Sequence, residues 1–204
     1  MANKQDEQLY GVWDMKWKGA ESKEALTFIG RQVFKAKRKI LTDVIKNIKV
    51  DTAIEVGCGL GFTMQVFQNL GLDCIGIDVS PYAVSACRRK GLRAELKKLE
   101  DITEQYDLVT SDGMLEHFIN FQPYAEHLMR ISRRYVLLIQ PNHGSFWGKT
   151  LVYFAELLRG NENVFEYNYR INDFTLFFKN NGFFIEKDLP IFFDVFRLLL
   201  FKKT

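Results

Sequence analysis

Three glycines at alternating positions, Gly57, Gly59 and Gly61, follow a short apolar run, and Glu55 stands two residues before the first of them. Glycines at a turn between a strand and a helix let the backbone approach a ligand closely and present free N–H groups to it. The dinucleotide-binding pattern places its third glycine one residue later, where this chain has Phe62. A carboxylate at position 55 would repel a pyrophosphate and would suit a ligand that carries an ammonium group.

A second acid, Asp78, ends the next apolar run, 17 residues beyond Gly61. At this distance from a glycine turn, a carboxylate can accept hydrogen bonds from the two hydroxyls of a ribose. Together with Glu55, this residue predicts a site for an adenosine whose tail is an amino acid rather than a phosphate.

These segments resemble the class I methyltransferases that depend on S-adenosylmethionine. The segment E-V-G-C-G-L-G is similar to their first motif, G-I-D-V-S to their ribose-binding motif, Y-D-L-V-T-S-D-G-M-L-E-H-F to their fourth-strand segment, and V-F-R-L-L-L-F-K-K to their last strand. The four segments stand in the family's order and span most of the chain. The resemblance implies S-adenosyl-L-methionine as the cofactor and S-adenosyl-L-homocysteine as the product.

The resemblance also assigns cofactor contacts along the chain. It places Glu55 and the glycine turn at the methionine end, Asp78 at the ribose, and a basic residue of the preceding helix at the cofactor carboxylate. Lys98 stands where the family usually has an acid for the adenine amino group, so the adenine contact stays open. The assigned set is Arg38, Glu55, Gly57, Cys58, Gly59, Gly61, Asp78, Val79, Leu99, Ser111 and Asp112.

Methyl transfer from a sulfonium mainly requires that nucleophile, methyl and sulfur be aligned in a dry pocket. A base helps only where the acceptor is protonated. Of the three histidines, His117 and His143 follow strands at the sheet edge where parallel sheets keep their sites, so both are candidate bases. For His117, a purely structural role in its own loop is an equal alternative, and His127 is expected to be structural.

A metal site is not expected. In a branch of the family that methylates quinone precursors, an acid three residues before the Glu-His pair can help hold a metal, and this chain has Gly113 there. Glu116 and His117 alone make a poor divalent site. The sequence therefore predicts a reaction that is independent of metal.

Strand and helix patterns alternate along the chain. A helical stripe over 21–48 precedes strand patterns over 53–56, 74–78, 92–96, 106–110 and 134–140, with helices between them. Two further strand patterns, 183–189 and 195–203, are joined by a short link, which favours an antiparallel pair. We expect an α/β, single-domain, Rossmann-like, doubly wound seven-stranded sheet, mostly parallel with one antiparallel strand near the C-terminus.

We expect one domain over 1–204. Its parts would be an N-terminal lid and helix over 1–50, a cofactor-binding core over 51–143, an aromatic cap insertion over 144–171, and a last helix with the C-terminal strand pair over 172–204. Trp13 and Trp17 would belong to the lid, with packing under the first helix as an equal alternative.

The insertion is rich in aromatic residues. About half of them are expected to pack down a helix whose face carries Leu151, Phe154, Ala155 and Leu158, and the others to line an acceptor site that favours a flat or apolar small molecule. The aromatic residues are Phe146, Trp147, Tyr153, Phe154, Phe165, Tyr167 and Tyr169.

The composition is that of an ordinary globular chain, with 204 residues, 47% apolar residues and a formal charge of +3. Three cysteines in no metal or disulfide pattern, and an N-terminus without a signal peptide, predict a cytoplasmic protein. No apolar run reaches the length of a membrane span. The net charge does not indicate a nucleic-acid partner, although the basic run 31–39 could dock one.

A small-molecule methyl acceptor is therefore the first hypothesis. A methyltransferase that acts on protein or nucleic acid, and a cofactor-binding protein without catalysis, are the alternatives. The oligomeric state is left open.

Overall fold

The structure is a computed structural model that describes residues 11–18, 28–146 and 166–204. Residues 11–18 form a helix. The other helices are α2 (Phe28–Lys46), α3 (Phe62–Asn69), α4 (Pro81–Arg89), α5 (Gln122–Arg130) and α7 (Ile171–Asn180), with the 3₁₀ turns η2 (Leu99–Asp101) and η3 (Leu115–His117). The strands are β1 (Thr52–Val56), β2 (Asp73–Asp78), β3 (Ala94–Leu96), β4 (Tyr106–Asp112), β5 (Ser132–Pro141), β6 (Phe183–Ile191) and β7 (Phe196–Lys203).

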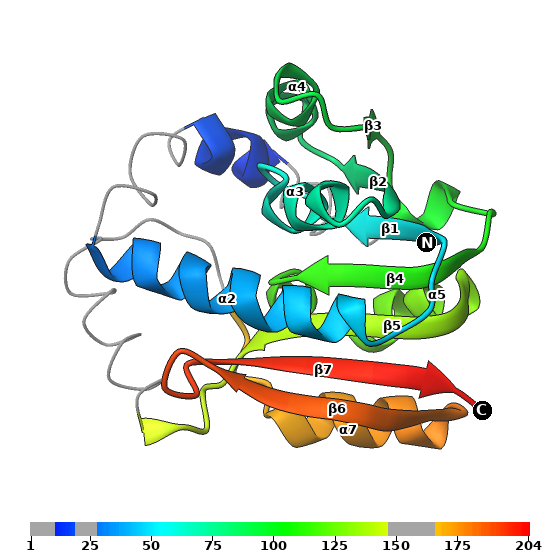
Figure 1. The fold of residues 1–204 in the computed structure, drawn as a ribbon. Helices are drawn as coiled ribbons and strands as arrows, with labels where there is room; N and C mark the ends of the chain where they lie inside the picture. The colour runs from blue at the N-terminus through cyan, green and yellow to red at the C-terminus, as the bar shows by residue number, and fades with distance from the viewer. Residues whose placement is uncertain (1–10, 19–27, 147–165) are drawn as a thin grey trace.

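The seven strands form one sheet in the order β3-β2-β1-β4-β5-β7-β6. β7 runs antiparallel to both of its neighbours, β5 and β6, and the remaining pairs are parallel. The predicted fold class is confirmed, including the single antiparallel strand. In Figure 1 the arrowheads of β1 and β4 point to the side where helix 11–18 lies. Ligands of open parallel sheets bind at this carboxyl edge.

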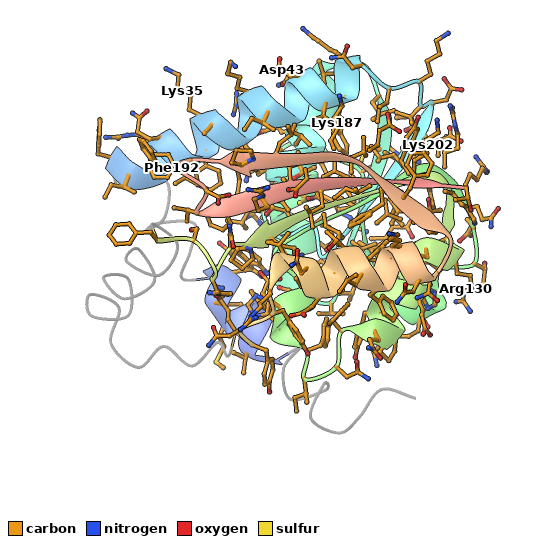
Figure 2. All side chains as sticks on the ribbon, turned by 90° about the horizontal axis from the view of Figure 1, so that it is seen from below. Lys35, Asp43, Arg130, Lys187, Phe192 and Lys202 are labelled. Atoms are coloured by element: carbon orange, nitrogen blue, oxygen red, sulfur yellow. The ribbon has the colours of Figure 1, made fainter. Side chains whose placement is uncertain are left out.

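Helices cover both faces of the sheet. Leu41 of α2 and Phe67 of α3 pack with Leu108, Leu137 and other apolar side chains of one face. Phe174 and Phe178 of α7, together with apolar residues of α5, pack on the other face. Figure 2 shows the sheet edge-on between α2 and α7. Burial on both faces explains why β4 and β5 read as nearly continuous apolar runs.

Local signals fix the end of β2 and the helix that follows it. Ser80 is the N-cap of α4, and its hydroxyl oxygen accepts a hydrogen bond from the Ala83 backbone N–H at 3.1 Å. Pro81 occupies the first helical position, and Gly91 beyond the helix has a φ of 74°. These residue types match the positions that a helix start and a helix end require.

The described part of α2 begins at Phe28, later than the predicted start at residue 21, and residues 19–27 lie outside the described residues. Most of the aromatic insertion also lies outside them, including Trp147, Tyr153 and Phe154 and the expected helix around Leu151 and Leu158. Phe165 and Ala155 lie in the same stretch. Within the described ranges, no helix is both long enough and apolar enough to cross a membrane.

Candidate functional site

The glycine turn after β1 has the backbone that its sequence predicts. Gly57, Gly59 and Gly61 all have positive φ, at 70°, 48° and 78°, a region that side chains strongly disfavour. A β-carbon at Gly59 would lie 2.7 Å from the ring of Trp17, and one at Gly61 would lie 2.5 Å from Leu92 Cδ1. Both the conformation and the packing around the turn therefore require glycine.

Asp78 ties the glycine turn to the end of β2. Its carboxylate accepts hydrogen bonds from the backbone N–H of Gly59 and from that of Ser80, each at 2.8 Å. The residue is only 5% exposed. Burial raises the pKa of Asp78, and the backbone hydrogen bonds lower it only in part. The carboxylate is thus held rigidly on a cavity wall, and its oxygens have further acceptor capacity.

Glu55 stabilises the start of the helix that follows the glycine turn. Its Oε2 accepts a hydrogen bond at 3.1 Å from the backbone N–H of Met64 in the first turn of α3. Burial raises the pKa of Glu55 well above its ordinary value. The side chain caps a helix start and does not line the cavity, so the expected contact with a ligand's ammonium group has no support from its position.

A cavity of about 240 Å³ opens at the carboxyl ends of β1, β2 and β4. Six of the predicted site residues line it: Gly57, Asp78, Val79, Leu99, Asp112 and His117. Seven do not: Arg38, Glu55, Cys58, Gly59, Gly61, Ser111 and His143. Cys58 packs in an apolar cluster with Met64 and Cys87, and the Ser111 hydroxyl donates to the carbonyl of Val56 at 3.1 Å. Cys58 and Ser111 therefore stabilise the glycine turn and the strand ends without lining the cavity.

The basic residue that reaches the cavity from α2 is Lys37, not Arg38. Lys37 is 8% exposed, and its Nζ lies 2.7 Å from Asp112 Oδ1 and 4.4 Å from the centre of the Phe196 ring. Arg38 is exposed, with its guanidinium 5.8 Å from the centre of the Phe62 ring. Neighbouring residues on a helix point about 100° apart, so a shift of one residue changes which side chain faces the site.

Helix 11–18 covers the cavity. Trp13 and Trp17 stack at 5.7 Å between ring centres, and both line the cavity. Asp14 anchors the helix to the start of α4, where its Oδ1 accepts hydrogen bonds from the Ser80 hydroxyl at 2.7 Å and from the Tyr82 backbone N–H at 3.0 Å. Hydrogen bonds from Lys18, Ser80 and Tyr82 lower the pKa of Asp14 to about 2.

Glu116 and His117 also line the cavity, and the charge of Asp112 acts on Glu116. Glu116 and His117 belong to η3, directly after β4, and both are buried. The ring of Trp13 meets that of His117 edge-on at 4.6 Å. The Nε2 of His117 lies 3.9 Å from Glu116 Oε1. This pair therefore lies under the covering helix.

Glu116 is the most perturbed acid of the cavity. Its side chain is 5% exposed, and its Oε2 has no hydrogen-bond partner among the residues that the structure describes. Burial first, and then the charges of Glu166 and Asp112, raise its pKa to about 8, against the opposing effect of Lys37. The sequence motif identified Glu116 only as a poor metal ligand. The burial of its side chain and the lack of a hydrogen-bond partner for Oε2 among the described residues are visible only in the fold.

His143 lies outside the cavity lining, behind Glu166, with 4.0 Å between its Nε2 and Glu166 Oε2. His127 contacts the Ile102 carbonyl from α5 at 3.3 Å. Within the described part of the chain, no three His, Cys, Asp or Glu side chains gather closely enough to hold a metal ion.

The sequence did not predict three aromatic residues of the cavity lining. These are Phe118, Tyr124 and Phe196, and nothing in the sequence distinguishes them from aromatic residues of the core.

Comparison with known proteins gives a sequence match over the core of this site. Residues 54–139 match the family model of a methyltransferase domain. An uncharacterized methyltransferase of Schizosaccharomyces pombe is 33% identical over 95 residues, which cover 42% of this chain. The chain spans 36% of the length of that relative.

Solved structures share the fold over the whole chain. Magnesium protoporphyrin IX methyltransferase from Synechocystis PCC 6803, crystallised with S-adenosylmethionine, superposes with a TM-score of 0.74 at 15% identity and covers 100% of this chain and 99% of its own. A methyltransferase from Thermotoga maritima, described as a possible histamine N-methyltransferase, gives a TM-score of 0.71 at 13% identity, covering 96% and 100%. The two differ in acceptor, so at these identities they bear on the fold alone.

Proposed function

We propose that the chain is a class I S-adenosylmethionine-dependent methyltransferase that transfers a methyl group from this cofactor to a small-molecule acceptor, because residues 54–139 match the family model of a methyltransferase domain and the fold matches that of a solved methyltransferase. The observation that carries the proposal is the cavity itself. It joins the rigidly held carboxylate of Asp78 to the buried pair Glu116 and His117, and aromatic side chains close it off.

The residues at the cavity suit the cofactor. The carboxylate of Asp78 can accept hydrogen bonds from ribose hydroxyls, and the turn at Gly57 lets backbone approach the ligand closely. Val79 and Leu99 offer apolar surface to the adenine. When bound, S-adenosylmethionine supplies a methyl group made electrophilic by its sulfonium.

The amino-acid tail of the cofactor meets a matching pair of charges. Lys37 and Asp112 form an ion pair on the cavity wall, at 2.7 Å. We assign the cofactor carboxylate to Lys37 and its ammonium group to Asp112, the roles that the sequence had suggested for Arg38 and Glu55. A zwitterion can bind to such a pair without leaving either buried charge unpaired.

Helix 11–18 acts as a lid. The cavity of about 240 Å³ is smaller than the roughly 300–1,000 Å³ of sites that hold drug-sized ligands, and Trp17 lies directly on Gly59. The helix must shift to admit the cofactor and then exclude water from the reacting groups. Its anchor is Asp14, which holds the start of α4.

The acceptor would lie against Trp13, Phe118, Tyr124 and Phe196. This aromatic wall supports a small molecule with a flat or apolar body. His117 faces the same space and remains a candidate base, while its edge-on contact with Trp13 supports a positioning role.

The test is to incubate the protein with S-adenosylmethionine labelled in its methyl group and with three separate fractions: small metabolites, proteins and nucleic acids. The expected result is label in a small molecule, which mass spectrometry then identifies. Label in a macromolecular fraction, lost as salt rises, would favour docking through the basic run 31–39. Tight cofactor binding with no label in any fraction would favour a non-catalytic protein. Asp78→Ala is the matched control, because it should lose transfer to every fraction.

A further inference from the structure

We propose that the acceptor's nucleophile is an amine, which enters the cavity as an ammonium ion and gives its proton to Glu116. This inference rests on the proposed function and specifies the acceptor of the same site. It makes Glu116 a catalytic residue that touches the reacting nitrogen.

The geometry points to a hydrogen-bond donor on the ligand. Glu116 Oε2 lies buried at the cavity and has no partner within the described parts of the chain, while Oε1 lies 3.9 Å from His117 Nε2. A carboxyl oxygen buried without a partner costs free energy, and native proteins seldom leave one without a function. The backbone of Glu116 is fixed, because its carbonyl accepts a hydrogen bond from the Tyr167 backbone N–H at 2.8 Å. Because Oε2 has less than 1 Å² of accessible surface, an N–H group of the acceptor reaches it only after a neighbouring side chain moves, while the backbone of η3 stays in place.

The charges around Glu116 favour a cation. Asp112 faces it from β4, Glu166 from the segment before α7 and Lys37 from α2, with His117 beside it in η3. Lys37 is paired with Asp112 at 2.7 Å, and His143 lies 4.0 Å from Glu166. Lys16 also lines the cavity, but the described lining of the cavity has five acids and three lysines. An acceptor that carries a carboxylate or a phenolate would be repelled here, whereas an ammonium ion would be attracted.

The proton affinity of Glu116 fits an amine. Burial raises its pKa to about 8, whereas an ordinary glutamate near 4.3 is a far weaker base than an alkyl amine with a pKa of about 10. Because Glu116 is mostly protonated at pH 7, binding of the ammonium ion first expels the carboxyl proton to solvent; then one N–H bond breaks, an O–H bond forms at Oε2, and the electron pair stays on nitrogen as the lone pair that attacks the methyl group. A base works best when its pKa lies close to that of the group it serves. A phenol has a similar pKa, but its deprotonation would create an anion beside Asp112 and Glu166.

The proposal predicts a proton count on binding. At pH 7, one unit below its pKa, Glu116 is about 90% protonated in the free protein. An ammonium ion that binds against it must displace one proton, either from the carboxyl or from the amine itself. Binding should therefore release about 0.9 proton per ligand.

The experiment is isothermal titration calorimetry of the full chain saturated with S-adenosylhomocysteine, at pH 7, in buffers of different ionisation enthalpy. The probes are 2-phenylethylamine and tryptamine, with 2-phenylethanol as the uncharged match of the first. We expect both amines to bind with release of about 0.9 proton and the alcohol to bind more weakly with none. Glu116→Gln should abolish the release, while Glu166→Gln, which removes a neighbouring acid that raises the pKa of Glu116, should only reduce it.

Three results, each in protein that binds S-adenosylhomocysteine, would overturn the inference: equal proton release by wild type and Glu116→Gln, no amine binding, or amine binding no tighter than that of 2-phenylethanol. Failure to bind S-adenosylhomocysteine, measured first in the same preparation, would instead count against the proposed function. A circular dichroism spectrum of each variant identifies one that fails to fold, and the wild-type comparison between amine and alcohol stands without the variants.

Discussion

Replacing Glu116 with glutamine should make the protein more stable at neutral pH. The fold raises the pKa of this carboxyl from 4.5 to about 8. Below pH 4.5 the group is neutral in both the folded and the unfolded chain and has no effect. Between 4.5 and 8 only the unfolded chain is ionised, so folding stability falls as pH rises, by about 1.4 kcal/mol per pH unit. At pH 7 the loss amounts to about 3 kcal/mol, and above pH 8 it stays constant.

The assay is urea unfolding of wild type and Glu116→Gln from pH 5 to pH 8. Glu55 and Asp78, whose pKa values are also raised, titrate alike in both proteins and cancel in the difference. We expect the difference in unfolding free energy to grow by about 3 kcal/mol in favour of glutamine between pH 5 and pH 7.5. Parallel curves would mean that Glu116 titrates normally and would refute the reasoning. Glu166→Gln, with a side chain that is 40% exposed, is a partial control: it removes a charge that raises the pKa of Glu116, so it should reduce the pH dependence without abolishing it.

Four further predictions concern the cofactor and the lid. Asp78→Ala should weaken S-adenosylmethionine and S-adenosylhomocysteine alike, by about 10-fold to 100-fold in calorimetry, because both carry the same ribose; a loss for one alone would contradict this. Lys37→Met should weaken S-adenosylmethionine about 10-fold and spare adenosine, whereas Arg38→Met should change neither. Asp14→Ala should speed dissociation of S-adenosylhomocysteine in stopped-flow tryptophan fluorescence, and an unchanged rate would argue against a lid. Transfer rates should be the same with and without EDTA, because the sequence predicts a reaction that is independent of metal; a loss of rate with EDTA would contradict that prediction.

The order of strands and helices could be predicted because its signals are local. Apolar runs such as those of β4 and β5 identify buried parallel strands, and Ser80, Pro81 and Gly91 mark the ends of α4. The positive φ of Gly57 also follows from residue type alone. The late position of the antiparallel strand followed from the short link between the last two strand patterns.

The inner geometry of the site depends on tertiary packing and could not be predicted. The sequence spacing predicted Glu55 near the glycine turn, but its carboxylate accepts a hydrogen bond from the backbone at the start of α3. A basic residue on α2 was expected at the site, yet helix register decides between Lys37 and Arg38. Glu116 is visible in the sequence motif, but its raised pKa depends on burial in the fold and on charges from distant parts of the chain, including Glu166.

A crystal structure with S-adenosylhomocysteine would test the central claim most directly. The account predicts ribose hydroxyls within hydrogen-bond distance of Asp78, the amino-acid carboxylate at Lys37, and the sulfur turned toward the space beside Glu116 and His117. A ligand bound outside this cavity, or bound within it with its ribose away from Asp78, would contradict the account.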